Sequence, residues 1–332
     1  MSNPIHADAA TGAAPRPRDV VLCECFARDG LQHEPAFIPT PQKAALIDRF
    51  AAIGFERVEA TSYSNPSLVP QFQDASALLQ QLPRRAGAYY KATCANPRAV
   101  ERATADRQLG FGANEISFLV SASESHSQRN LKRSRAAQWD NVRQMRELAG
   151  DGFRIVGTVS VAFGCPFEGR VDPQQVVRDV EAFARLGVTM VALGDTTGMA
   201  TPRAIHALVG QIAAEVPGVT LVAHFHDSRG TGLVNCLAAY EAGVRHFDAA
   251  FGGVGGHPAT ITYGGGYTGN VCTEDLVNLF EAQGVRTGID LDSLLETAEL
   301  CEKALNRPLL GHVTRTGLSP LIGHASAPET VR

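Results

Sequence analysis

The sequence predicts an α/β protein built as a (β/α)8 TIM barrel with extra C-terminal helices. From Val20 onward, short runs rich in apolar and β-branched residues alternate with longer stretches of helical composition. The alternation occurs about eight times, and eight is the number of such units that closes a parallel barrel. The turn after the first strand, Arg28-Asp29-Gly30, is not the glycine-rich nucleotide turn expected of a doubly wound open sheet.

Each predicted strand is a short apolar run followed by a predicted helix. Proline stands at the start of several helices, where its missing N–H is tolerated. We assign residues 1–18 to a flexible tail, 19–285 to the barrel, and 286–332 to a C-terminal extension with a helix at 290–306. The strands are expected at 20–24, 57–61, 88–94, 113–119, 154–161, 190–193, 219–224 and 246–250. The helices are expected at 41–53, 68–82, 97–109, 136–149, 173–186, 202–216, 233–242 and 273–282.

Length and composition agree with one large domain. At about 100–200 residues per domain, the 332 residues suit either two domains or a single barrel. Charged residues make up only 19% of the chain, which argues against a disordered or coiled-coil protein. The formal net charge of −4 argues against a general binder of nucleic acid or anionic membranes. We therefore expect no nucleic-acid partner and no membrane partner.

The cysteines and the N-terminus indicate a cellular compartment. The chain has seven cysteines and no CxxC pair, so a disulfide framework or zinc ribbon is not expected. No stretch approaches the roughly 18 continuous apolar residues of a membrane span. The first 18 residues lack the apolar core of a signal peptide. These features predict a cytoplasmic protein.

Two histidines at the end of the seventh predicted strand suggest a metal site. Residues i and i+2 of a strand point to the same face, so His224 and His226 can both face the barrel mouth. Asp29, at the end of the first strand, can add a carboxylate. Two imidazoles and an oxygen ligand suit a divalent metal. The alternative is that the histidines are hydrogen-bonded packing residues.

Arg28 and a glycine-rich segment are further candidates at the same end of the barrel. The Arg28 guanidinium suits a developing enolate or carboxylate oxygen. It could equally form a salt bridge at the barrel mouth, for example with Glu59. The glycine-rich segment 252–269 lacks the Lys-Ser/Thr of a P-loop, and it could be a phosphate cradle, a lid or a plain flexible loop.

Taken together, the motifs at the strand ends resemble those of the 3-hydroxy-3-methylglutaryl-CoA lyase family, within the wider group of metal-dependent barrel lyases and Claisen-type synthases. The resemblance runs from about residue 20 to residue 308. It rests on an ordered set of segments rather than on any one motif. These are Arg28-Asp29-Gly30-Leu31-Gln32, Val58-Glu59-Ala60-Thr61-Ser62, Ser121-Ala122-Ser123-Glu124, Gly164-Cys165-Pro166, Leu193-Gly194-Asp195-Thr196, His224-Phe225-His226-Asp227 and Gly269-Asn270.

The resemblance implies a role for each of these positions. It implies a divalent metal, Mg²⁺ or Mn²⁺, and an acyl-CoA substrate, with a homodimer or higher homo-oligomer as the assembly. Arg28 would stabilise an enolate, and Glu59 and Asp195 would belong to the acid–base network. The implied metal ligands are Asp29, His224, His226 and Asn270, and the implied substrate-binding residues are Gln32, Ser62, Asn130, Ser134 and Thr158.

The implied reaction is a retro-Claisen cleavage. A 3-hydroxyacyl-CoA with a second carboxylate would bind the metal, and loss of its hydroxyl proton would break the C2–C3 bond. The thioester enolate would lie opposite Arg28 and would be protonated by a general acid. The products would be acetyl-CoA and a ketoacid.

Two positions depart from the family pattern. The lyases carry a catalytic cysteine within Gly-Gly-Cys-Pro, whereas this chain has His257 within Gly255-Gly256-His257-Pro258. Histidine can transfer protons near neutral pH, so His257 could replace the thiol, or it could be an exposed loop residue. Thr158 stands where the lyases usually carry tyrosine. Both changes suggest altered acyl specificity, for example toward citramalyl-CoA.

Three other interpretations stay open on the sequence alone. A Claisen-type synthase would share the barrel and the two histidines and would run the reaction in the direction of condensation. A metal-free scaffold would have lost catalysis, although the retained ligand set argues against this. An aldolase acting on 4-hydroxy-2-oxoacids would use the same kind of metal site.

Overall fold

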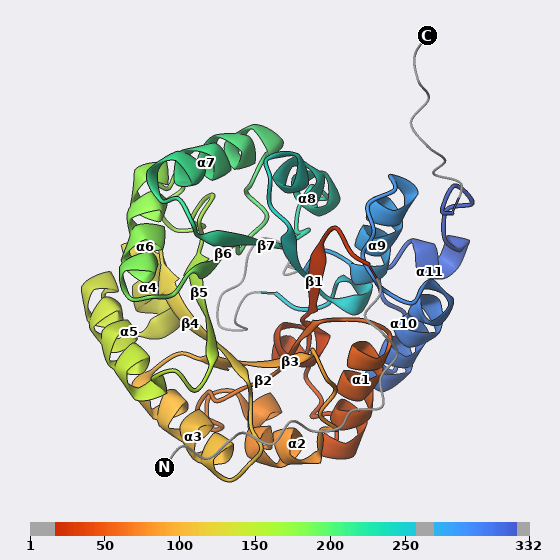
Figure 1. Ribbon diagram of the computed structural model, residues 1–332, viewed down its shortest axis with the longest axis horizontal. Helices are drawn as coiled ribbons and strands as arrows, with labels where there is room; N and C mark the ends of the chain where they lie inside the picture. The colour runs from red at the N-terminus through yellow and green to blue at the C-terminus, as the bar shows by residue number, and fades with distance from the viewer. Residues whose placement is uncertain (1–16, 257–268, 324–332) are drawn as a thin grey trace.

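The computed structural model, which describes residues 17–256 and 269–323, contains one closed parallel barrel. Its strands follow one another around the barrel in chain order (Figure 1). The first and last strands close it, with Val21 paired with His246. The predicted fold class is therefore confirmed. The strands are β1 (Val21–Glu24), β2 (Arg57–Ser62), β3 (Tyr89–Cys94), β4 (Glu115–Ser121), β5 (Arg154–Ser160), β6 (Met190–Asp195), β7 (Thr220–Phe225) and β8 (His246–Ala249).

Helices surround the barrel as an outer ring (Figure 1). Several begin at a side chain that caps the free N–H groups of the first turn, as Asn96 and Thr201 do for the helices starting at Pro97 and Pro202. The ring comprises α1 (Thr40–Ala52), α2 (Ala75–Gln81), α3 (Pro97–Gln108), α4 (Glu124–Leu131), α5 (Arg135–Ala149), α6 (Pro173–Arg185), α7 (Pro202–Glu215), α8 (Gly232–Glu241) and α9 (Thr273–Ala282).

Two helices differ from the sequence prediction. The second helix was expected at 68–82, but α2 covers only Ala75–Gln81, because Pro70–Phe72 forms a separate 3-10 turn. The short helix α4 was not predicted. Its sequence is polar and lacks an apolar stripe, and it begins where the Ser123 side chain accepts a hydrogen bond from the His126 N–H.

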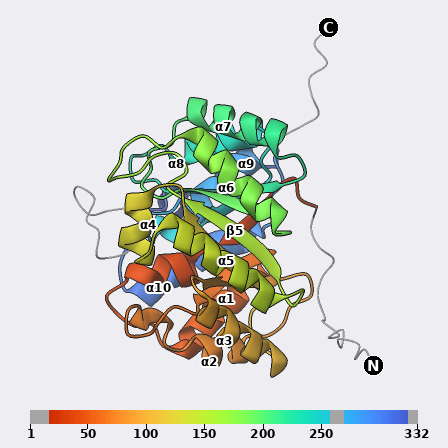
Figure 2. The same cartoon turned by 90° about the vertical axis from the view of Figure 1, so that its left-hand side faces the viewer.

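The C-terminal extension packs beside the first helix of the ring. It contains α10 (Leu291–Leu305) and α11 (Val313–Thr316). Arg49 of α1 forms an ion pair with Glu296 of α10 at 2.6 Å, and the two helices lie side by side in Figure 2. Most of the predicted tail, residues 1–18, lies outside the described residues.

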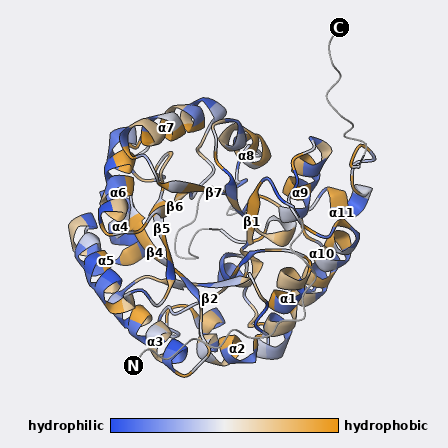
Figure 3. Cartoon of the chain, in the orientation of Figure 1, coloured by the Kyte–Doolittle hydropathy of each residue, from blue (hydrophilic) through white to orange (hydrophobic). Residues whose placement is uncertain are grey.

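The core lies mainly between the strands and the helix ring. The ring helices carry alternating hydrophobic and hydrophilic colours in Figure 3, as expected for helices with one buried face. All seven cysteines are buried and free of disulfides. Among the described residues, no helix is both long and apolar enough to cross a membrane.

The inside of the barrel has two unlike halves. Val156, Ala192 and Val222, from β5, β6 and β7, form a small apolar cluster. On β2, β3, β4 and β8, buried charged side chains occupy the interior instead, namely Arg57, Glu59, Lys91, Glu115 and Asp248. Barrel interiors are usually filled by branched apolar residues, so the charged half is unusual.

Candidate metal centre at the barrel mouth

Three metal-ligand side chains converge at the carboxyl ends of the strands. Asp29 lies on η1 (Phe26–Gly30), a π-helical turn that follows β1. His224 lies near the end of β7, and His226 follows it, so both rings face the same side with centroids 5.3 Å apart. One ligand atom from each of the three side chains lies within 4.8 Å of the others. The spatial proximity expected from the spacing is therefore present.

Asn270 completes this group. Its Nδ2 donates to Asp29 Oδ2 at 2.8 Å and to the Val254 carbonyl at 2.9 Å, which leaves its Oδ1 free to act as a ligand. Asn270 Oδ1 and both ring nitrogens of His226 are buried without a hydrogen-bond partner. Buried polar atoms without partners are costly, and a divalent cation can take the carboxylate oxygen, the amide oxygen and one ring nitrogen of each histidine as ligands. The residues therefore fit a metal ion.

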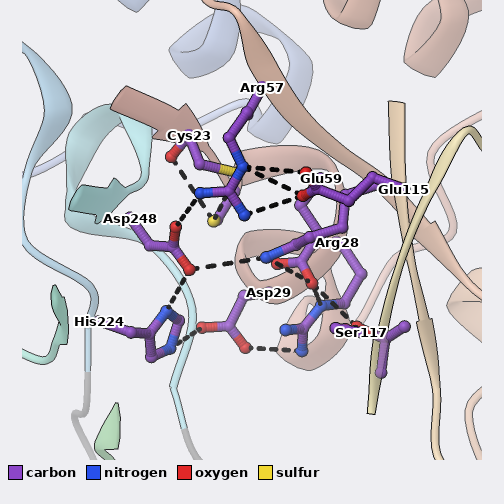
Figure 4. Close-up of polar contacts among 12 residues, drawn as sticks. Cys23, Arg28, Asp29, Arg57, Glu59, Glu115, Ser117, His224 and Asp248 are labelled. Carbon is purple, nitrogen blue, oxygen red and sulfur yellow. Dashed lines mark hydrogen bonds and ion pairs between the residues drawn. The ribbon is translucent and has the colours of Figure 1, made fainter. Parts of the chain in front are cut away.

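The charges around the centre favour cation binding. Burial opposes ionisation of Asp29, but Arg28 and the two histidines outweigh it and hold the pKa of this carboxyl well below its usual range. Asp29 is therefore a carboxylate at neutral pH. His224 Nδ1 lies 3.1 Å from Asp248 Oδ2, a contact that directs Nε2 toward Asp29 (Figure 4). A carboxylate behind a metal-binding histidine fixes both the tautomer and the ring orientation.

Protonation of His224 predicts a pH dependence of metal binding. Burial lowers the pKa of His224, but the hydrogen bond and charge of Asp248 outweigh it and raise the pKa above its ordinary value. A metal needs the neutral ring, so we expect Mn²⁺ affinity to rise between about pH 6 and pH 8, with proton release on binding. Calorimetry in two buffers of different ionisation enthalpy measures this, and a flat affinity without proton release would contradict it.

Arg28 lies against the centre. Its Nε is 2.8 Å from Glu59 Oε1, and its Nη1 is 3.2 Å from Asp29 Oδ1 (Figure 4). The salt bridge with Glu59 that was one of the two expectations is therefore present. Burial raises the pKa of Glu59, but Arg28 and Lys91 outweigh it and hold the pKa below its ordinary value. Glu59 is thus a permanent carboxylate that orients Arg28.

Asp195, at the end of β6, supports the next loop. Its two oxygens accept the N–H groups of Met199 at 2.7 Å and Ala200 at 3.0 Å. Burial raises the pKa of this carboxyl, and the two N–H groups partly offset that effect. These two hydrogen bonds stabilise the turn between Asp195 and Ala200.

The candidate substrate residues lie on several elements. Gln32 is next to the centre, with Oε1 at 3.5 Å from Arg28 Nη1. The Ser62 hydroxyl contacts Ser64 Oγ at 2.7 Å at the end of β2. Ser134 caps α5, Asn130 lies in α4, and the half-buried Thr158 lies in β5. His257 lies outside the described residues.

The start of the glycine-rich segment has a packing role. Gly255 has a φ of +105°, and a Cβ atom there would lie 2.4 Å from Asn270 Nδ2 and 3.0 Å from the Asp29 carbonyl oxygen. No side chain fits without moving these two candidate ligands. Glycine at this position therefore lets the chain pass directly behind the centre.

Replacing Gly255 with alanine should disturb the centre. We expect Mn²⁺ affinity to fall about tenfold or more, the range seen when support around a metal ligand is lost. Gly243→Ala is the matched control, because Gly243 has a φ of +101° but nothing within 4 Å of the added Cβ. The metal affinities of both variants, measured by calorimetry, should differ. Equal affinities would show that the close approach is unimportant.

The charged residues behind the centre were not predicted from the sequence. Asp248 accepts from His224, and Lys91 lies 3.5 Å from the same carboxylate. Arg57 pairs with Glu115 at 2.8 Å deeper in the barrel. The signal was available, since charged residues at alternate positions of an otherwise apolar strand indicate a charged inner face.

Cys23, Cys25 and Asp248 form a second group of ligand types. The Asp248 carboxylate is already occupied by His224, Lys91 and Arg57. Burial raises the pKa of the Cys25 thiol well above its ordinary value. The carboxylate is already paired with cations and the thiol is protonated, so we assign no site to this group.

Several known proteins similar to this chain are named as acyl-CoA lyases. The chain is 34% identical over 296 residues to a hydroxymethylglutaryl-CoA lyase of Bacillus subtilis, covering 89% of this chain and 96% of that protein. It is 35% identical over 305 residues to the (R)-citramalyl-CoA lyase of Chloroflexus aurantiacus, and the match covers 90% of this chain and 95% of that protein. The fold is also similar to that of an HMG-CoA lyase from Acinetobacter baumannii, solved in complex with coenzyme A and 3-methylmalate. The two structures superpose with a TM-score of 0.85 at 36% sequence identity, and the match covers 91% of this chain and 96% of that chain.

The fold, the site and these relatives define an enzyme of the carbon–carbon lyase class. A family model described as HMGL-like matches residues 19–301. The chain therefore belongs to the HMGL-like family.

Proposed function

We propose that this protein cleaves a 3-hydroxy-3-substituted dicarboxyl-CoA into acetyl-CoA and a ketoacid, with hydroxymethylglutaryl-CoA as the first candidate substrate. The observation that carries the proposal is the convergence of Asp29, His224 and His226 with Asn270, beside Arg28. Supporting it are similar proteins named as hydroxymethylglutaryl-CoA and citramalyl-CoA lyases. Citramalyl-CoA is the second candidate, because Thr158 and His257 both depart from the family pattern.

The metal would be Mg²⁺ or Mn²⁺, held by Asp29, His224, His226 and Asn270. When bound, it would lower the pKa of the substrate hydroxyl, so that loss of the hydroxyl proton drives cleavage of the C2–C3 bond. Mg²⁺ and Mn²⁺ prefer the oxygen ligands that Asp29 and Asn270 supply.

Arg28 would bind the oxygen of the leaving thioester enolate. Its guanidinium is charged at every physiological pH, and it is fixed by Glu59 before substrate arrives. A donor that is already oriented stabilises developing charge without reorganising during the reaction. A general base would take the proton that leaves the substrate hydroxyl, and a general acid would return one proton to the enolate carbon, so that the reaction balances.

We propose that His257 supplies or relays that proton. It occupies the position of the family's loop cysteine, and imidazole titrates near neutral pH. His257→Ala should lower kcat by roughly 10²–10⁴-fold, the usual share of general acid–base catalysis. His257→Cys should restore part of the rate. An alanine variant as fast as the parent would remove His257 from the mechanism.

A substrate panel tests the proposed reaction directly. The purified protein, loaded with Mg²⁺ or Mn²⁺, is mixed with hydroxymethylglutaryl-CoA, citramalyl-CoA and related acyl-CoAs, and acetyl-CoA release is followed. We expect cleavage of at least one member. No cleavage of any member would contradict the proposal, and condensation of acetyl-CoA with a 2-oxoacid would identify a synthase instead.

We further propose a cytoplasmic homodimer or larger homo-oligomer. The proposal follows from the family resemblance, which implies such an assembly. Light scattering on the purified protein measures the assembly, and a monomeric mass at micromolar concentration would contradict it.

A further inference from the structure

The charged half of the barrel interior requires an explanation. Burying ions costs free energy that their attraction only partly offsets, and apolar replacements of buried ion pairs often stabilise a protein. The other half of the same interior is filled by apolar residues, so the fold itself does not require the charges. The charges alternate in sign along the barrel toward the metal centre, and Figure 4 labels all of them except Arg154 and Lys91. The members are Arg154, Glu115, Arg57, Asp248, Lys91, Glu59, Arg28 and Asp29.

Lys91 contacts two buried carboxylates of this network. It lies on β3 and its side chain is only 4% exposed. Its Nζ is 3.5 Å from Asp248 Oδ2 and 3.4 Å from Glu59 Oε1. One ammonium group therefore bridges two buried carboxylates that come from different strands.

The two carboxylate oxygens that Lys91 contacts also contact His224 and Arg28. Asp248 Oδ2 is the oxygen that contacts His224 Nδ1, whereas Arg57 contacts the other oxygen, Oδ1. Glu59 Oε1 is likewise the oxygen paired with Arg28 Nε. Lys91 is thus one contact removed from both the candidate metal ligand and the candidate enolate-binding group.

We propose that Lys91 is a positioning residue that fixes His224 through Asp248 and Arg28 through Glu59. The proposal rests on the metal centre of the proposed function. The two carboxylates flank the ammonium and, against the effect of burial, hold the pKa of Lys91 well above its ordinary value. Lys91 therefore acts as a fixed cation and not as a nucleophile.

Positioning and simple charge predict opposite effects on metal affinity. A fixed cation near a metal site repels the metal, so removing charge alone would tighten Mn²⁺ binding. Removing a positioning group frees Asp248 and His224 to move, which weakens Mn²⁺ binding. The sign of the change in affinity therefore separates the two roles.

The test uses the full-length protein and Mn²⁺ as the probe, with affinity measured by calorimetry and by electron paramagnetic resonance. We expect Lys91→Met to weaken Mn²⁺ binding about tenfold, in the range seen for lost outer partners of metal ligands. We also expect it to lower kcat more than it changes KM. Lys43→Met is the matched control, because Lys43 is equally buried and pairs with Asp74 at 2.6 Å outside the barrel.

A double-mutant cycle with Asp248→Asn shows whether Lys91 acts through Asp248. In the Asp248→Asn background, Lys91→Met should change Mn²⁺ affinity by less than about twofold. If Lys91→Met does not fold, Lys91→Gln takes its place in the cycle. Unchanged or tighter Mn²⁺ binding, or an equal loss in both backgrounds, would overturn the proposal. Failure of the parent protein to bind Mn²⁺ would instead reject the metal centre itself.

Discussion

Replacing Arg28 with methionine is expected to lower kcat by roughly 10²–10³-fold, the usual effect of removing one pre-oriented donor from a developing oxyanion. Arg28 is the guanidinium held by Glu59 at 2.8 Å and by Asp29 at 3.2 Å, so it is fixed at the metal centre before substrate arrives. Mn²⁺ affinity should not fall, because Arg28 is a cation rather than a ligand. Steady-state kinetics at saturating Mn²⁺, together with Mn²⁺ titration, measure both effects.

Two variants make the Arg28 result interpretable. Arg28→Lys keeps the positive charge but loses the planar guanidinium that the Glu59 and Asp29 carboxylates orient. Its kcat should therefore lie between those of Arg28→Met and the parent protein. Arg135→Met removes another partly buried ion pair, with Asp179 at 2.6 Å between α5 and α6, and should leave kcat close to the parent value. A full rate in Arg28→Met would mean that Arg28 is only a structural ion-pair partner.

Replacing Asp29 with asparagine should abolish metal binding and cleavage together. Asp29 is the only carboxylate among the three clustered ligands, and its charge is held by Arg28 and the histidine pair. The amide conserves the shape and the acceptor for Asn270 Nδ2, so the fold should persist. We expect Mn²⁺ affinity to fall by more than the tenfold to hundredfold that outer partners cost, since a direct ligand is lost.

The control for Asp29 is a buried carboxylate elsewhere. Asp106→Asn replaces a buried carboxylate of the outer helix α3, which accepts a hydrogen bond from the Tyr63 hydroxyl at 2.6 Å. Its Mn²⁺ affinity should match that of the parent. Retention of both affinity and activity in Asp29→Asn would exclude this residue as a ligand.

Most of the barrel was predictable because short apolar runs alternate regularly with stretches of helical composition along the chain. Each strand is within three residues of its predicted bounds at either end, since apolar runs between turns are a local signal. Helix α4 was missed because its stability comes from a Ser123 cap and not from an apolar stripe. The second helix was predicted too long because Pro70 starts a separate turn.

The candidate metal centre could be anticipated for a geometric reason. The carboxyl ends of parallel strands meet at one face, so Asp29 and His224 must approach each other once the barrel closes. The dependence on Gly255 could not be read from the sequence, because it arises from a 2.4 Å approach across the fold. The bridging role of Lys91 needed the strand register, which sets β3 beside β2 and puts Lys91 opposite Glu59.

Cleavage by this protein should depend on a divalent metal held at the Asp29, His224 and His226 centre. The protein is stripped with a chelator and titrated with Mn²⁺ while metal content and acetyl-CoA release from hydroxymethylglutaryl-CoA are measured on the same samples. We expect no cleavage without metal and a rate that rises in proportion to bound Mn²⁺ until a single ion is bound per chain. An unchanged rate in the stripped protein would show that the reaction does not need the metal.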